Sequence, residues 1–150
     1  GGRALGAGGR AQLHPSRTDR GYIMSAYADF SIPKLKLLVK GCDLESGWLT
    51  MGRVLKVLGH KANPAKHKEI LTEIEISDRT AAYLVAIVTR LDAQIIKVPQ
   101  GIGWRKMAEV APVITYDNQA IIFSKVLSHT REDLIEMRKN RTLTNPGKSI

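Results

Sequence analysis

Apolar residues recur every three or four positions along most of this chain, which is the spacing of amphipathic helices. The clearest case is the stretch 77–98, where apolar residues step by four and three along one face. Ser77 or Asp78 can cap its start, and Pro99 follows its end. The pattern predicts that this stretch is the longest helix of the protein.

Shorter segments show the same spacing and are bounded by glycine, proline or capping residues. These segments, each predicted to be a helix, are 30–39, 48–58, 65–74, 115–127 and 131–138. Residues 104–110 fit either a further helical turn or an irregular loop, and residues 113–115 are predicted to be extended. We therefore expect an all-α fold.

The two ends of the chain differ in composition from the rest. Residues 1–29 are predicted to form a disordered basic tail, because the beginning is rich in Gly and Ala and has no apolar period. Its arginines, which we expect to contact DNA phosphates, are Arg3, Arg10, Arg17 and Arg20. An organelle targeting peptide is the alternative interpretation. Residues 30–138 are predicted to form one domain, and 139–150 a polar C-terminal tail.

Charge and cysteine content narrow the classes of function. The 150 residues carry a formal net charge of +9, which favours a polyanionic partner such as nucleic acid. The single cysteine, Cys42, favours a reducing compartment. No Gly-rich phosphate loop, paired metal-ligating histidines or nucleophile set is evident, so we expect neither an enzyme nor a cofactor. No apolar run approaches the roughly 20 residues that a membrane helix needs.

Several stretches resemble the histone fold, in which a short helix, a long central helix and a second short helix follow one another. Residues 51–58 (Met-Gly-Arg-Val-Leu-Lys-Val-Leu) resemble the first core helix of type-2A histones. Residues 76–96 resemble the first loop and the central helix, and 113–121 resemble the second loop and the third helix. Residues 131–134 are similar to the acidic start of the C-terminal helix of these histones. The resemblance implies a histone fold with an extra N-terminal helix, an insertion at 62–72 and a C-terminal helix.

The resemblance also implies a function. It implies a DNA-packaging protein of nucleus and chromatin that pairs with a type-2B-like histone and joins type-3 and type-4 histones in a nucleosome-like octamer. The domain residues expected to contact DNA phosphates are Arg53, Lys56, Arg79, Arg105 and Lys106. Two histone loop arginines that usually enter the minor groove are replaced here by Glu75 and Pro112. Two positions that contribute to the acidic surface patch of histones are occupied by Gln94 and Lys97. These departures indicate a distant lineage, such as a giant-virus or protist histone.

A physical argument supports the heterodimer. The helix expected at 77–98 is apolar nearly all round, so it must be covered on more than one side. Short flanking helices from one chain offer too little cover, so we expect a second chain to cross it and the isolated monomer to be partly unfolded. The predicted interface residues are Tyr83, Leu84, Ile87, Val88, Leu91, Ile95 and Ile121.

Three alternatives remain open. The arginine-rich beginning equally fits a basic structural subunit of a mitochondrial assembly. The segments around 54–59 and 63–74 faintly resemble calmodulin-like linkers, which would make the chain a degenerate, metal-free interaction module. A CCAAT-binding-type histone-fold subunit would share the fold and the pairing but act at promoters.

Overall fold

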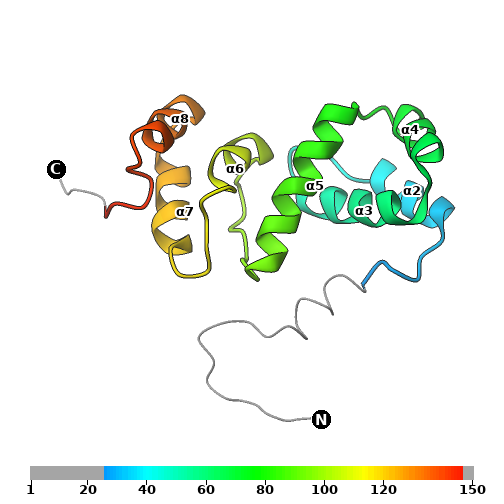
Figure 1. Ribbon diagram of the computed structural model, residues 1–150, viewed down its shortest axis with the longest axis horizontal. Coiled ribbons are helices and arrows are strands. Elements are labelled where there is room, and N and C mark those ends of the chain that lie inside the picture. Colours follow the sequence, from blue (N-terminus) through cyan, green and yellow to red (C-terminus); the bar gives the residue numbers. More distant parts are fainter. Residues whose placement is uncertain (1–25, 147–150) are drawn as a thin grey trace, which may run out of the picture.

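A computed structural model describes residues 26–146 of the chain (Figure 1). This part is all-α and contains no strand, which confirms the predicted fold class at that level. Its helices are α2 (Ile32–Lys40), α3 (Trp48–Lys61), α4 (Pro64–Glu73), α5 (Asp78–Ala93), α6 (Trp104–Val110), α7 (Gln119–Ser128) and α8 (Arg131–Lys139). The first 25 residues, including the four tail arginines, and residues 147–150 lie outside the described part.

Capping side chains fix the starts of four helices. The side-chain oxygens of Ser31, Asn63 and Ser77 each accept a hydrogen bond from a backbone N–H in the first turn of α2, α4 and α5. Thr130 and Asp133 form a reciprocal capping box at α8. Each cap satisfies a donor that the helix itself leaves unpaired, so these boundaries follow from local sequence.

The helices form two groups on either side of α5 (Figure 1). Helix α3 packs against α2 and α5, and α4 packs against α3 and α5. On the other side, α6 packs against α5 and α8, while α7 contacts α6 and α8. Glu109 of α6, whose side chain is only 10% exposed, ties α6 to α8 through ion pairs to Arg131 at 3.0 Å and Arg138 at 3.2 Å.

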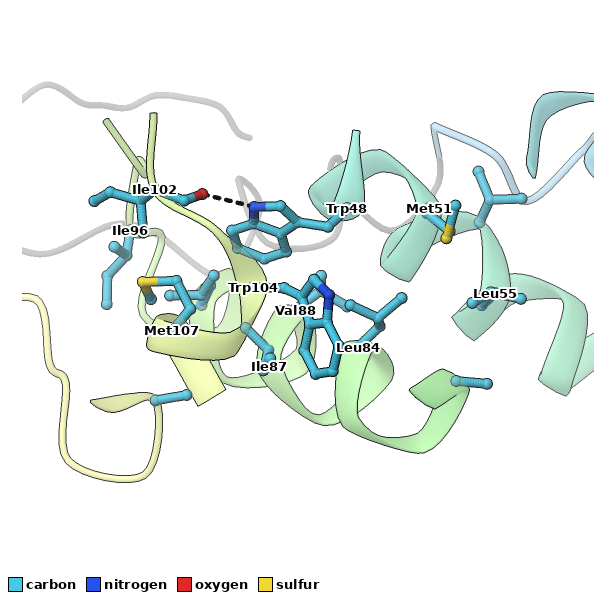
Figure 2. Packing of buried hydrophobic residues seen from close by; sticks show 14 of the residues in the cluster. Trp48, Met51, Leu55, Leu84, Ile87, Val88, Ile96, Ile102, Trp104 and Met107 are labelled. Carbon is cyan, nitrogen blue, oxygen red and sulfur yellow. Dashed lines mark hydrogen bonds between the residues drawn. The ribbon is translucent and has the colours of Figure 1, made fainter. Parts of the chain in front are cut away.

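Buried hydrophobic residues of α3, α5 and α6 meet in one part of the core (Figure 2). Trp48 from α3 and Met107 from α6 are buried there beside Val88 of α5. The indole N–H of Trp48 donates to the carbonyl oxygen of Ile102 at 2.9 Å, which satisfies a polar atom inside the core. Helix α5 is therefore the central element, covered by helices from both parts of the chain.

Helix α5 is shorter than predicted. It ends at Ala93 rather than reaching residue 98, because Ile95 adopts a left-handed conformation with φ +50°. The amide of Ile96 donates to the carbonyl of Leu91 at 2.9 Å, and the amide of Ile95 donates to that of Asp92 at 3.1 Å. This is a Schellman motif without glycine, and it turns the side chain of Ile96 into the core.

The argument that only a second chain could cover this helix is also wrong. Four predicted interface residues are buried within the chain itself, at 0–2% exposure, and they are Leu84, Ile87, Val88 and Leu91. The cover comes from α3, which is longer than predicted, and from α6, since residues 104–110 form the helix that was one of the two structures expected there. Of the remaining interface residues, Tyr83 is 42% exposed, while Ile95 and Ile121 are half-buried.

The segment before α7 also differs from the prediction. Residues 113–115 are not a strand, and the helix begins at Gln119 instead of residue 115 or 117. The side chains of Thr115 and Asn118 each accept a hydrogen bond from the backbone N–H of the other, at 3.1 Å and 2.7 Å. Asn118 also donates to the carbonyl of Val113. These local bonds hold a turn that competes with the first turn of a longer helix.

Candidate nucleic-acid interface

Two arginines and two aromatic residues from α5 and α6 lie together in a group that we call the arginine–aromatic patch: Arg79, Tyr83, Trp104 and Arg105. Arg79 and Tyr83 are four residues apart in α5 and so share one face of the helix. The Arg79 guanidinium donates to the Tyr83 hydroxyl at 3.3 Å and lies 5.7 Å from the centre of its ring. The Tyr83 and Trp104 rings are 6.3 Å apart at an angle of 32°, and Arg105 lies 4.8 Å from the Trp104 ring.

The patch exposes two cationic side chains, Arg79 and Arg105. Arg79 is exposed, and its hydrogen bond to Tyr83 raises the pKa of the guanidinium further above its ordinary value. Arg105 pairs with Glu45 at 3.6 Å, but both side chains are more than half exposed, so a competing anion can displace the carboxylate at little cost. The patch can therefore bind an anion and present the exposed Tyr83 ring to a flat group beside it.

Trp104 is the buried member of the arginine–aromatic patch. It is 8% exposed, and its indole N–H has no hydrogen-bond partner within the described residues. The ring packs beside Leu84 and Val88 in the core (Figure 2), as expected for a Trp that follows Gly103. The guanidinium of Arg105 thus lies over a ring that is fixed in the core, while Tyr83 supplies the exposed aromatic surface.

Arg53, one of the residues predicted to contact DNA, is engaged in an ion pair within the chain. Its guanidinium binds the carboxylate of Asp92 in α5 through Nη2 at 2.7 Å and Nε at 3.2 Å. The Asp92 side chain is 6% exposed and that of Arg53 is 27% exposed, so this ion pair is a partly buried tie between α3 and α5. An arginine held by a carboxylate in this way is not available to a phosphate without leaving a charge buried.

The remaining predicted contacts are dispersed. Lys106 donates to the carbonyl of Val126 at 3.0 Å and so joins α6 to the end of α7. Lys56 lies half-buried on α3 and is not part of the arginine–aromatic patch. Of the five domain residues predicted to contact DNA, the structure brings together two, Arg79 and Arg105. The i, i+4 spacing of Arg79 and Tyr83 is the only signal in the sequence that could have indicated Tyr83 as a surface residue.

Residues 26–146 were also considered for metal ligands, cysteine chemistry and membrane helices. Between residues 26 and 146, no group of three or more His, Cys, Asp or Glu residues is placed to hold a metal ion. Cys42 is half-buried and free, and burial raises the pKa of its thiol. Within the same residues, no helix has the length and apolarity required to cross a membrane.

The chain was also compared with known proteins. No protein-family model matches it, and neither a curated protein nor a solved structure shows a significant match.

Proposed function

We propose that this chain is a non-enzymatic protein that binds nucleic acid through the arginine–aromatic patch. The observation that carries the proposal is that Arg79 and Arg105, from two helices, each lie against one of two neighbouring aromatic rings, Tyr83 and Trp104. Guanidinium groups bind phosphates, and an exposed tyrosine ring stacks on a base of any sequence. The expected ligand is therefore a nucleic acid in which bases are accessible, bound with little sequence preference.

The overall charge supports the same conclusion. A net charge of +9 attracts a polyanion, and each phosphate that a basic side chain neutralises releases a counterion. The affinity should consequently fall as salt rises, with a slope that reports the number of phosphate contacts.

The test compares two double variants that lose the same charge. Arg79→Ala with Arg105→Ala removes both patch arginines, whereas Lys34→Ala with Lys139→Ala removes two exposed lysines from α2 and α8. Binding of a fluorescent single-stranded oligonucleotide is measured by anisotropy at several salt concentrations. We expect the patch variant to lower the salt slope by roughly 1.4 units, because each phosphate contact contributes about 0.7 for single strands. Equal slopes for the two variants would refute the proposal.

A substitution of Tyr83 separates stacking from charge. Tyr83→Ala should weaken binding of the single strand by about 1–3 kcal/mol, whereas Tyr83→Phe should retain most of the affinity. A Tyr83→Ala variant that binds as tightly as the unchanged protein would remove the aromatic part of the proposal.

Pairing with a type-2B-like histone in a nucleosome-like particle is a narrower form of the proposal, supported by the resemblance of 51–58 and 76–96. This narrower form requires a conformational change, because Leu84 and Val88, which would meet a partner, are buried by α3 and α6. The chain would have to release this cover to pair. Co-expression with candidate histone partners, followed by nuclease digestion of reconstituted DNA, tests this form. A protected DNA length supports it, and a monomer that binds DNA without protecting it contradicts it.

A further inference from the structure

A groove of about 550 Å³ runs between α3, α4 and α5, on a side of α5 different from the one that carries Arg79 and Tyr83. Its floor is apolar and comes from all three helices: Leu55 of α3, Leu71 of α4, and Ala81 and Val85 of α5. Small residues at its mouth keep it open, since Gly59 and Ala82 are exposed there. A shaped apolar floor of this kind fits side chains rather than phosphates.

The rim of the groove is basic. Lys56 and His60 line it from α3, His67 and Lys68 line it from α4, and Asp78 is its one acidic lining residue. Within the described residues, neither Lys56 nor Lys68 forms an ion pair. The rim therefore has two lysines whose charges are not neutralised by an ion pair, beside the side chains of His60 and His67.

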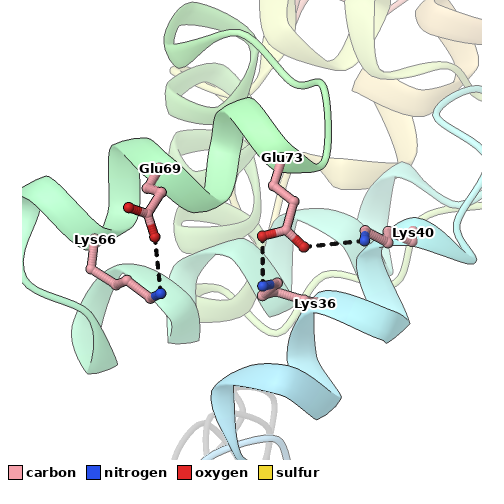
Figure 3. A network of polar contacts seen from close by, with 5 residues as sticks. All are labelled: Lys36, Lys40, Lys66, Glu69 and Glu73. Atoms are coloured by element: carbon pink, nitrogen blue, oxygen red, sulfur yellow. Dashed lines mark hydrogen bonds and ion pairs between the residues drawn. The ribbon is translucent and has the colours of Figure 1, made fainter.

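The acidic residues of α4 do not offset this charge, because each is already engaged (Figure 3). Glu69 pairs with Lys66 at 3.0 Å, and Glu73 pairs with Lys36 at 2.7 Å and Lys40 at 3.2 Å. The two hydrogen bonds from α2 lower the pKa of Glu73, so this carboxylate stays charged and paired. The lysines on the rim are consequently left for an external partner.

We propose that this groove binds an acidic, amphipathic helix of a partner protein. Leucine-like side chains of that helix lie on the apolar floor, and its flanking carboxylates meet Lys56 and Lys68. An amphipathic helix in a hydrophobic groove is a common mode of recognition, and charge complementarity at the rim sets partner choice and orientation. This inference does not depend on nucleic-acid binding, because the two surfaces share no residue.

Other occupants fit less well. Nucleic acid offers phosphates to the rim but has no flexible apolar side chains to fill the floor. The first 25 residues of this chain carry four arginines and one aspartate, so their charge has the same sign as the rim. A second copy has a net charge of +9 and is repelled for the same reason.

The test uses three fluorescein-labelled synthetic peptides and the full chain, with binding measured by anisotropy. The first peptide is an amphipathic helix with Leu at positions i, i+4 and i+7 and Glu on its other face. The second replaces every Glu by Lys, and the third replaces every Leu by Ser. We expect the first peptide to bind at least about tenfold more tightly than either of the others, because the groove requires both properties. Equal binding of the first and third peptides would mean that charge alone causes the interaction and that the apolar floor has no role, which would overturn the proposal.

Matched variants locate the binding site. Ala82→Phe fills the groove, whereas Ala86→Phe adds the same ring to an exposed position of α5 that does not line it. Lys68→Glu reverses a rim charge, whereas Lys139→Glu makes the same change on α8. We expect Ala82→Phe and Lys68→Glu each to weaken the first peptide by about tenfold or more, with the two controls near the unchanged protein. Helix content by circular dichroism confirms that each variant is folded.

Two results would overturn the inference. One is that the control variants weaken the peptide as much as the groove variants do. The other is that a DNA oligonucleotide displaces the peptide and its own binding is lost in Lys68→Glu but retained in Ala82→Phe. In that case the rim is a phosphate site and the apolar floor has no role.

Discussion

Helix α3 approaches α5 closely at Gly52, and replacing this residue by alanine tests how tightly the two helices pack. An added Cβ would lie 2.7 Å from Cγ1 of Val88 and 3.0 Å from the carbonyl oxygen of Leu84. Val88 is fully buried, and the carbonyl belongs to the middle of α5. Neither atom can move away easily, so the methyl group forces the helices apart.

The expected magnitude is the balance of two opposing terms. Alanine is favoured over glycine inside a helix by about 0.8–1 kcal/mol. Overpacking of a dense core costs about 1–3 kcal/mol, and the upper part of this range applies because one of the two close contacts is with backbone. We therefore expect Gly52→Ala to lower the free energy of unfolding by about 1–2 kcal/mol.

Gly59, in the same helix, provides the matched control. A Cβ at this exposed position would meet only Nε2 of His67 at 3.8 Å, which is an ordinary contact. Gly59→Ala should consequently raise the free energy of unfolding by about 0.5–1 kcal/mol. The two identical substitutions are thus expected to have opposite signs.

Urea unfolding followed by far-ultraviolet circular dichroism measures both effects. With a denaturant dependence of about 2 kcal/mol per molar, a middle value for small proteins, Gly52→Ala should lower the midpoint by roughly 0.5–1 M. If Gly52→Ala is as stable as the unchanged protein, the packing of α3 on α5 described above is wrong. A loss of similar size in Gly59→Ala would show instead that helix geometry, and not the contact with α5, causes the effect.

Three further predictions concern charge and burial. Arg53→Ala should destabilise the fold by about 2–3 kcal/mol and Asp92→Ala by less, because only Arg53→Ala leaves a buried charge, that of Asp92, without its partner. Urea unfolding of both variants checks this order. Glu73→Gln should lower the free energy of unfolding at neutral pH but not in acid. Hydrogen bonds from two lysines lower the pKa of Glu73, so their contribution to stability is lost as pH falls through that lowered value. A difference in stability between the variant and the unchanged protein that persists in acid contradicts this. Leu91→Asp should unfold the isolated chain, at a cost of about 4 kcal/mol or more, because Leu91 is fully buried by its own chain; a folded, monomeric variant by circular dichroism and gel filtration would disprove it.

The sequence predicted helix starts better than helix ends. Ser77 and Thr130 act within three residues of themselves, so their role could be read directly from the chain. The end of α5 could not be read in this way, because continued helical spacing through Ile95 and Val98 gives no local stop signal. The left-handed turn at Ile95 is stabilised by burial of Ile96, which depends on residues far along the chain.

The features of the candidate site also fall into those that the sequence predicts and those that depend on tertiary contacts. The sequence alone established a basic, all-α chain and identified Arg79 and Arg105 as candidate contacts. Asp92 is a buried carboxylate of α5. Its partner Arg53 lies 39 residues away, and only the packing of α3 on α5 brings the two together.

Sequence by itself therefore determined composition, charge and the local hydrogen bonds that begin helices, because these depend on neighbouring residues. Tertiary structure decided which apolar faces are covered, which basic side chains are already paired and which remain available. The distinction is physical, because burial and ion pairing depend on contacts between helices that are distant in sequence. For this reason the apolar residues of α5 are covered within the chain itself, and Arg53 is held by Asp92, while the side chains of Arg79 and Arg105 are exposed.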